Sequence, residues 1–155
     1  MAVNRDFEDL LRALNSVRAR YLVAGAYAVI FYTEPRYTKD IDIWVDPTPE
    51  NARKVYEALK RFGAPVKNLT LRDLTNSRMV YQIGIEPNRI DVLMGIGGVS
   101  FEAAWKKKRV SRYGGQRIHL LDRIDLIRSK KEANRLQDKL DLQLLSKASR
   151  RKTRR

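Results

Sequence analysis

The stretch DIDIWV at Asp40–Val45 places an aspartate or a tryptophan at every second position and an isoleucine or valine between them. A period of two predicts a β-strand with one apolar and one polar face. Asp40 and Asp42 are therefore expected to project from the same face. Two carboxylates on one rigid strand suit a hard divalent cation, because such ions prefer oxygen ligands. The same short pattern also arises by chance at a strand end in solvent, so both interpretations remain open.

A third acid follows the same pattern further along the chain. Asp91 stands between Ile90 and Val92 in a second expected strand, Arg89–Leu93. If this strand lies beside Asp40–Val45, the three carboxylates converge on one site.

Gly25 separates the short apolar run Tyr21–Ala24, which predicts a buried strand, from the apolar segment Ala26–Tyr32, which predicts a helix. The free backbone N–H groups and the dipole at such a helix start favour a phosphate group. Gly25 can equally be an ordinary turn glycine.

The rest of the chain predicts a single α/β (α+β) domain with a mixed sheet flanked by helices and with helices at its C-terminal end. The sequence predicts helices at residues 6–18, about 48–61, 100–107, 122–130 and about 135–146, and two hairpins, 79–85 with 89–93 and 109–113 with 116–120. The domain is expected to span residues 1–146, and residues 147–155 are expected to form a basic, disordered tail.

The composition excludes several kinds of chemistry. The chain has no cysteine, so disulfides, thiolate zinc sites and cysteine nucleophiles are excluded. His119 is the only histidine, which leaves carboxylates as the main groups for metal binding or proton transfer. The longest apolar stretch, Tyr21–Tyr32, is too short to span a bilayer, and the N-terminus does not resemble a signal peptide. We therefore expect a cytoplasmic location and no membrane partner.

The net charge of the 155-residue chain is +14, and a large share of it lies at the C-terminus. This charge indicates a polyanionic partner, because lysine and arginine release condensed counterions when they bind nucleic acid. A solubilising surface is the alternative. The expected nucleic-acid contacts in the tail are Lys147, Arg150, Arg151, Lys152, Arg154 and Arg155.

Several motifs together resemble the nucleotidyltransferase superfamily of DNA polymerase beta-like folds. They are YLVAGA at 21–26, RYTKDIDI at 36–43, IDVL at 90–93, and a C-terminal series made of Lys131, Arg135, Asp138 and Asp141-Leu142. The likeness covers about residues 21–145. It is strongest to the abortive-infection and toxin-antitoxin nucleotidyltransferases.

The resemblance implies a nucleotidyltransferase-like mixed sheet and transfer of an NMP from an NTP to a hydroxyl group, with Mg²⁺ or Mn²⁺. It implies that Asp40 and Asp42 ligate two metal ions and that Asp91 ligates one and helps deprotonate the acceptor. Residues in the glycine turn and before the first aspartate would bind the triphosphate: Gly25, Ala26, Arg36 and Thr38. Lys131, Arg135 and Asp138 would line the opposite side of the cleft, although a solvated helix face explains the same pattern.

Two departures from the family pattern put turnover in question. Ala26 stands where relatives have glycine or serine, and Gln137 stands where many have lysine. The leading hypothesis is an enzyme that modifies RNA such as tRNA. The alternatives are a catalytically weak or inactive nucleic-acid-binding protein, and a toxin-antitoxin component that modifies a protein hydroxyl and has a partner antitoxin or toxin.

Two further side chains have competing interpretations. Trp44 lies on the same expected strand face as the acids, where it could stack on a base or simply pack at the rim. His119 is interpreted as structural, because no neighbouring acid in the sequence would activate it.

Overall fold

The computed structural model describes residues 3–33, 40–85 and 88–154, with side chains up to residue 148. In chain order the elements are α1 (Arg5–Ser16), β1 (Tyr21–Ala24), α2 (Gly25–Tyr32), β2 (Asp40–Val45), α3 (Pro49–Phe62), a short 3-10 helix η1 (Asp73–Thr75), β3 (Val80–Ile83), β4 (Arg89–Leu93), α4 (Phe101–Lys106), β5 (Arg109–Tyr113), β6 (Gln116–Leu120), α5 (Arg123–Ala133) and α6 (Leu136–Arg154).

The six strands form one mixed sheet in the order β3-β4-β2-β1-β6-β5. Strand β2 runs parallel to β4, and β1 runs parallel to β6, while the other neighbouring pairs are antiparallel. The β3–β4 and β5–β6 pairs are the two hairpins that the sequence predicts. The expected α/β class with a mixed sheet is therefore confirmed.

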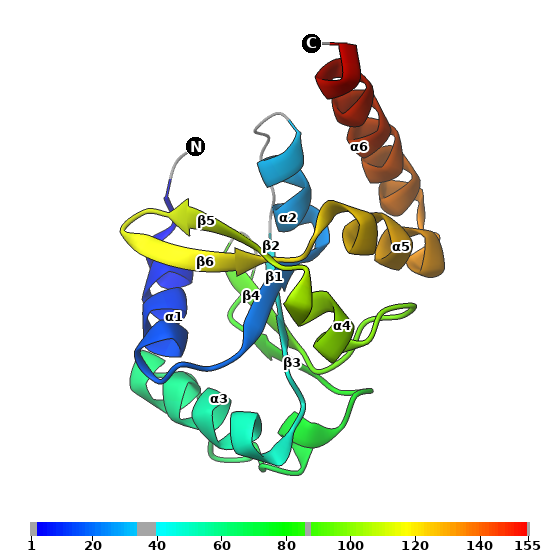
Figure 1. Ribbon diagram of the computed structural model, residues 1–155. Helices are drawn as coiled ribbons and strands as arrows, with labels where there is room; N and C mark the ends of the chain where they lie inside the picture. The colour runs from blue at the N-terminus through cyan, green and yellow to red at the C-terminus, as the bar shows by residue number, and fades with distance from the viewer. Residues whose placement is uncertain (1–2, 34–39, 86–87, 155) are drawn as a thin grey trace.

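Helices cover both faces of this sheet. Helices α1 and α3 pack against each other on one side, and α4 and α5 lie on the other (Figure 1). Phe101 of α4 packs edge-on against Trp44 of β2, with ring centroids 5.0 Å apart. This contact assigns α4 to the face from which Trp44 projects, which is also the face of the alternating aspartates.

Local sequence signals explain where the helices begin and end. Asn4 caps α1 by accepting hydrogen bonds from the backbone N–H groups of Asp6 and Phe7. Thr48 caps α3 and is followed by a proline at the first helical position. Gly63 ends α3 in the left-handed conformation, with φ of 96°.

The C-terminal helices differ from their predicted bounds. Asp122 is the N-cap of α5, and this helix continues to Ala133, where Asn134 ends it with φ of 52°. Helix α6 extends to Arg154 and so passes the boundary that we expected at Ser146. Its last turns project away from the sheet (Figure 1). Within the described ranges, none of the helices has both the length and the apolar composition needed to cross a membrane.

Candidate active site

The three aspartates come together because β2 and β4 lie side by side. In this parallel pair Asp42 is the partner of Asp91, and Asp40 is the partner of Arg89. Paired residues of neighbouring strands project from the same face, so all four side chains share the face that carries α4 and α5. The condition that the sequence left open, adjacency of the two strands, is met.

Arg89 bridges two of these acids. Its guanidinium donates a hydrogen bond to Oδ2 of Asp40, and its Nη2 lies 3.4 Å from Oδ2 of Asp91. Its Nε lies 3.3 Å from Oδ1 of Asp91. Arg89 is not among the residues predicted from the sequence, although one signal for it is present: a cation two residues before Asp91 on a strand must share its face.

Gly25 brings the start of α2 against the same acids. It adopts φ of 63°, and a Cβ at this position would collide with the carboxylate of Asp42. Glycine is therefore required both by the left-handed backbone and by the close approach of Asp42. The positive end of α2 thus lies beside a carboxylate, although a dipole of this kind acts only over the first turn.

The other predicted phosphate ligands are Ala26, Arg36 and Thr38. Ala26 lies half-buried in the first turn of α2. Arg36 and Thr38 lie outside the described residues, so their roles remain predictions.

Asp42 is the electrostatically unusual group of the site. Burial raises its pKa, and the neighbouring charge of Asp91 raises it further, to about 7. A hydrogen bond with Asp91 acts in the same direction, and the charge of Lys130 acts against both. Near neutral pH the Asp42 carboxyl group can therefore hold a proton.

A buried ion-pair cluster lies at the junction of α5 and α6. Lys130 is 4% exposed, and its Nζ lies 3.1 Å from Oδ1 of Asp138 and 3.0 Å from Oδ2 of Asp141. Both aspartates are completely buried. Arg135 donates from Nε to Oδ2 of Asp138 at 2.8 Å.

Of the three residues predicted to line the cleft, Arg135 and Asp138 belong to this cluster, whereas Lys131 is exposed and Lys130 is the lysine that pairs with the acids. Their place in a substrate cleft stays a prediction. Gln137, which replaces a common lysine, donates to Oδ1 of Asp141 at 2.9 Å. The solvated-face alternative does not hold for Asp138, because that side chain is buried.

The cluster is also electrostatically connected to the three aspartates. The hydrogen bond with Asp138 is the largest cause of the raised pKa of Arg135, and the charge of Asp42 contributes to it as well. Lys130 in turn lowers the pKa of Asp42. The charges of Lys130 and Arg135 are therefore coupled to the charge of Asp42.

The donor set of Asp40, Asp42 and Asp91 consists of oxygens only, which fits Mg²⁺ or Mn²⁺ better than softer metals. In the side-chain positions of the described residues, no group of three acidic or histidine side chains is arranged to hold a metal ion. The Arg89 guanidinium engages two of the three acids, Asp40 and Asp91. Their use as metal ligands stays a prediction.

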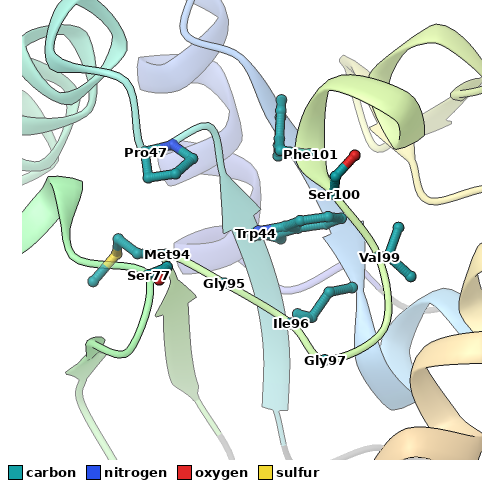
Figure 2. A pocket seen from close by; sticks show the side chains of 10 residues that line it. All are labelled: Trp44, Pro47, Ser77, Met94, Gly95, Ile96, Gly97, Val99, Ser100 and Phe101. Atoms are coloured by element: carbon teal, nitrogen blue, oxygen red, sulfur yellow. The ribbon is translucent and has the colours of Figure 1, made fainter.

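Trp44 is a packing residue. It is 2% exposed, which excludes stacking on a base without rearrangement. A cavity of about 400 Å³ lies beside it (Figure 2), bounded by the loop that leaves β4 and by α4. None of the predicted site residues lines this cavity, whose walls are Trp44, Pro47, Ser77, Met94, Gly95, Ile96, Gly97, Val99, Ser100 and Phe101.

His119 and the basic tail complete the set of predicted residues. His119 packs against Trp105 with ring centroids 5.1 Å apart, and burial lowers its pKa, which agrees with a structural role. Lys147 is exposed on α6. The structure describes only the backbone of Arg150, Arg151, Lys152 and Arg154, and Arg155 lies outside it, so their contacts with nucleic acid remain predictions.

Comparison with known proteins supports the fold. No protein family model matches the chain, and no curated protein matches it. Among solved structures, the chain is similar to the lincosamide antibiotic adenylyltransferase LnuA in its lincomycin-bound form, with a TM-score of 0.60 and 15% identity. The similarity covers 94% of this chain and 97% of that chain. At this identity the likeness establishes the nucleotidyltransferase-like fold alone. The closer likeness to abortive-infection and toxin-antitoxin enzymes stays a prediction.

The raised pKa of Asp42 predicts a pH-dependent stability. Because the folded state holds a proton that the unfolded state releases above pH 4, the free energy of unfolding should fall as pH rises from about 4 to about 7. Asp42→Asn removes this titration. Relative to the wild type, the variant should gain roughly 3 kcal/mol across that window, at about 1.4 kcal/mol per pKa unit. Urea unfolding in EDTA at several pH values measures this, and parallel pH profiles of the two proteins would contradict it.

The buried cluster predicts different roles for two adjacent lysines. Lys130→Met leaves two buried carboxylates without their shared cation, so the free energy of unfolding should fall by about 3–5 kcal/mol. Lys131→Met changes an exposed side chain and should alter it by less than about 0.5 kcal/mol. Thermal and urea unfolding of both variants measure the difference. Equal losses in the two variants would show that Lys130 is not the structural cation.

Proposed function

We propose that this protein transfers a nucleoside monophosphate from an NTP to a hydroxyl group, using Mg²⁺ or Mn²⁺ held by Asp40, Asp42 and Asp91. The single observation that carries the proposal is the pairing of Asp42 with Asp91 on one face of the sheet, with Gly25 in close approach to Asp42. A fold shared with an antibiotic adenylyltransferase supports the same reaction class.

In the proposed transfer reaction the residues have the following roles. The acceptor oxygen attacks the α-phosphorus, a new P–O bond forms, and the bond to the bridging oxygen breaks so that pyrophosphate leaves. The acceptor proton passes to the Asp42–Asp91 pair, in which burial and the charge of Asp91 raise the pKa of Asp42 to about 7. A divalent cation held by Asp40, Asp42 and Asp91 would supply charge stabilisation for this transfer. The start of α2 at Gly25 offers backbone N–H groups to the phosphates.

RNA, such as tRNA, is the acceptor that we favour. The net charge of +14 supports a polyanionic acceptor, because each phosphate contact releases counterions. The neighbour LnuA is described as acting on a lincosamide antibiotic, so a small hydroxyl compound is the competing acceptor class. A nucleic-acid-binding protein without turnover would retain RNA binding and lose none of it with Asp42→Ala.

The test is transfer of label from α-³²P-labelled NTPs, with Mg²⁺ or Mn²⁺, to total RNA in one arm and to lincomycin in the other. We expect label in RNA with the wild type and a loss of at least about a hundredfold with Asp91→Asn, since the variant removes a proton acceptor and a ligand. Asp9→Asn is the matched control, because Asp9 is an exposed acid on α1. Label only in lincomycin would reject the RNA acceptor and keep the reaction. No transfer to either acceptor, together with no NTP binding by calorimetry, would reject the enzyme.

A further inference from the structure

Arg89 is the charged group that lies among the three aspartates from within their own strand pair. It precedes Asp91 by two residues on β4 and is the register partner of Asp40 on β2. The strand geometry therefore directs a guanidinium and three carboxylates to one face. No rotation of a loop or a domain is needed to bring them together.

The guanidinium engages the acids from two directions. It forms an ion pair with Asp40 and a two-point contact with Asp91, through Nε to Oδ1 at 3.3 Å and through Nη2 to Oδ2 at 3.4 Å. The side chain of Arg89 is 29% exposed, while that of Asp91 is only 11% exposed. Ion pairs that are largely removed from water are screened less than surface pairs, so the attraction between Arg89 and Asp91 is stronger than that of an exposed pair.

The same carboxylate oxygens are the ones that a divalent cation would need. A guanidinium between Asp40 and Asp91 and a cation shared by those residues would repel each other at a few ångströms. The two arrangements therefore compete for the same oxygens. A triphosphate changes this competition, because its oxygens offer a guanidinium an equally suitable planar, paired acceptor.

We propose that Arg89 is a resident counter-cation that holds Asp40 and Asp91 until a nucleotide arrives, so that the divalent cation binds weakly alone and tightly together with the triphosphate. This inference rests on the proposed function, and Arg89 acts in it as a positioning residue. The cost of displacing Arg89 from the acids is offset when the triphosphate accepts its hydrogen bonds. Metal and nucleotide then strengthen each other's binding, and the coupling is reciprocal.

The test compares binding rather than turnover. Binding of Mn²⁺ alone is measured by electron paramagnetic resonance of the free ion, for the wild type, Arg89→Gln and Arg112→Gln. Arg112 is an exposed arginine on β5, at the opposite edge of the sheet from β3 and β4, so its variant matches the loss of charge. We expect Arg89→Gln to bind Mn²⁺ at least about tenfold more tightly than the wild type, because a nearby positive charge is gone. Arg112→Gln should bind like the wild type.

A second measurement addresses the coupling. Calorimetry with α,β-methylene-ATP, with and without Mn²⁺, gives the factor by which metal tightens nucleotide binding. This factor should be larger in the wild type than in Arg89→Gln, since only the wild type has a guanidinium to transfer. Circular dichroism of each variant checks that it is folded.

The outcomes separate the two proposals. If Arg89→Gln binds Mn²⁺ no more tightly than the wild type while label transfer is intact, the role of Arg89 is overturned and the enzyme remains. If Arg89→Gln shows the gain in Mn²⁺ affinity but no acceptor is labelled, Arg89 has the proposed role and the proposed reaction fails. If neither protein binds Mn²⁺ with or without the nucleotide, both proposals are overturned.

Discussion

Asp42 and Asp91 lie side by side on two parallel strands, and the repulsion between their carboxylates is the constraint that the surrounding structure must satisfy. Burial makes the repulsion stronger, because there is less water to screen it. The pKa of Asp42 is accordingly raised, and the guanidinium of Arg89 forms an ion pair with Asp91. The two interior strands β2 and β4 therefore concentrate negative charge on one face of the sheet, where it can bind a cation.

The helices outside the sheet also contribute groups that lie against Asp42 or act on its charge. Helix α2 begins at Gly25. This residue can approach Asp42 closely because it has no Cβ atom. At the α5–α6 junction, Lys130 is held by Asp138 and Asp141, and its charge acts on Asp42 from the far side. Asp138 also pairs with Arg135, and together these contacts tie α5 to α6.

Much of the fold was predictable because its signals are local. Alternation in DIDIWV, the glycine pair at Gly114-Gly115 and the cap at Thr48 each act over a few residues, and each gave the observed element. The adjacency of β2 and β4 could be stated only as a condition for the convergence of the three acids, because strand order depends on contacts between distant segments. The end of α6 was misplaced, since a basic composition does not by itself prevent a helix from continuing.

The site was predictable in its acids and less so in its cations. Asp40 and Asp42 share a face through strand periodicity, which the sequence displays directly, whereas Asp91 joins them through the pairing of β2 with β4. The sequence did not show which of Lys130 and Lys131 is buried, because this depends on where each residue lies around the axis of α5. One residue rotates a side chain by about 100° around a helix. Arg89 was missed because its importance comes from its register with Asp40 across two strands, which no single segment encodes.

The central claim is that three acids from two strands hold a divalent cation together. Crystals soaked with Mn²⁺ and α,β-methylene-ATP, and measured for anomalous scattering by manganese, test it most directly. The result in favour is a manganese peak at about 2.1 Å from carboxylate oxygens of both Asp42 and Asp91. A nucleotide bound with no manganese at these residues, or manganese bound elsewhere in the molecule, would contradict the claim.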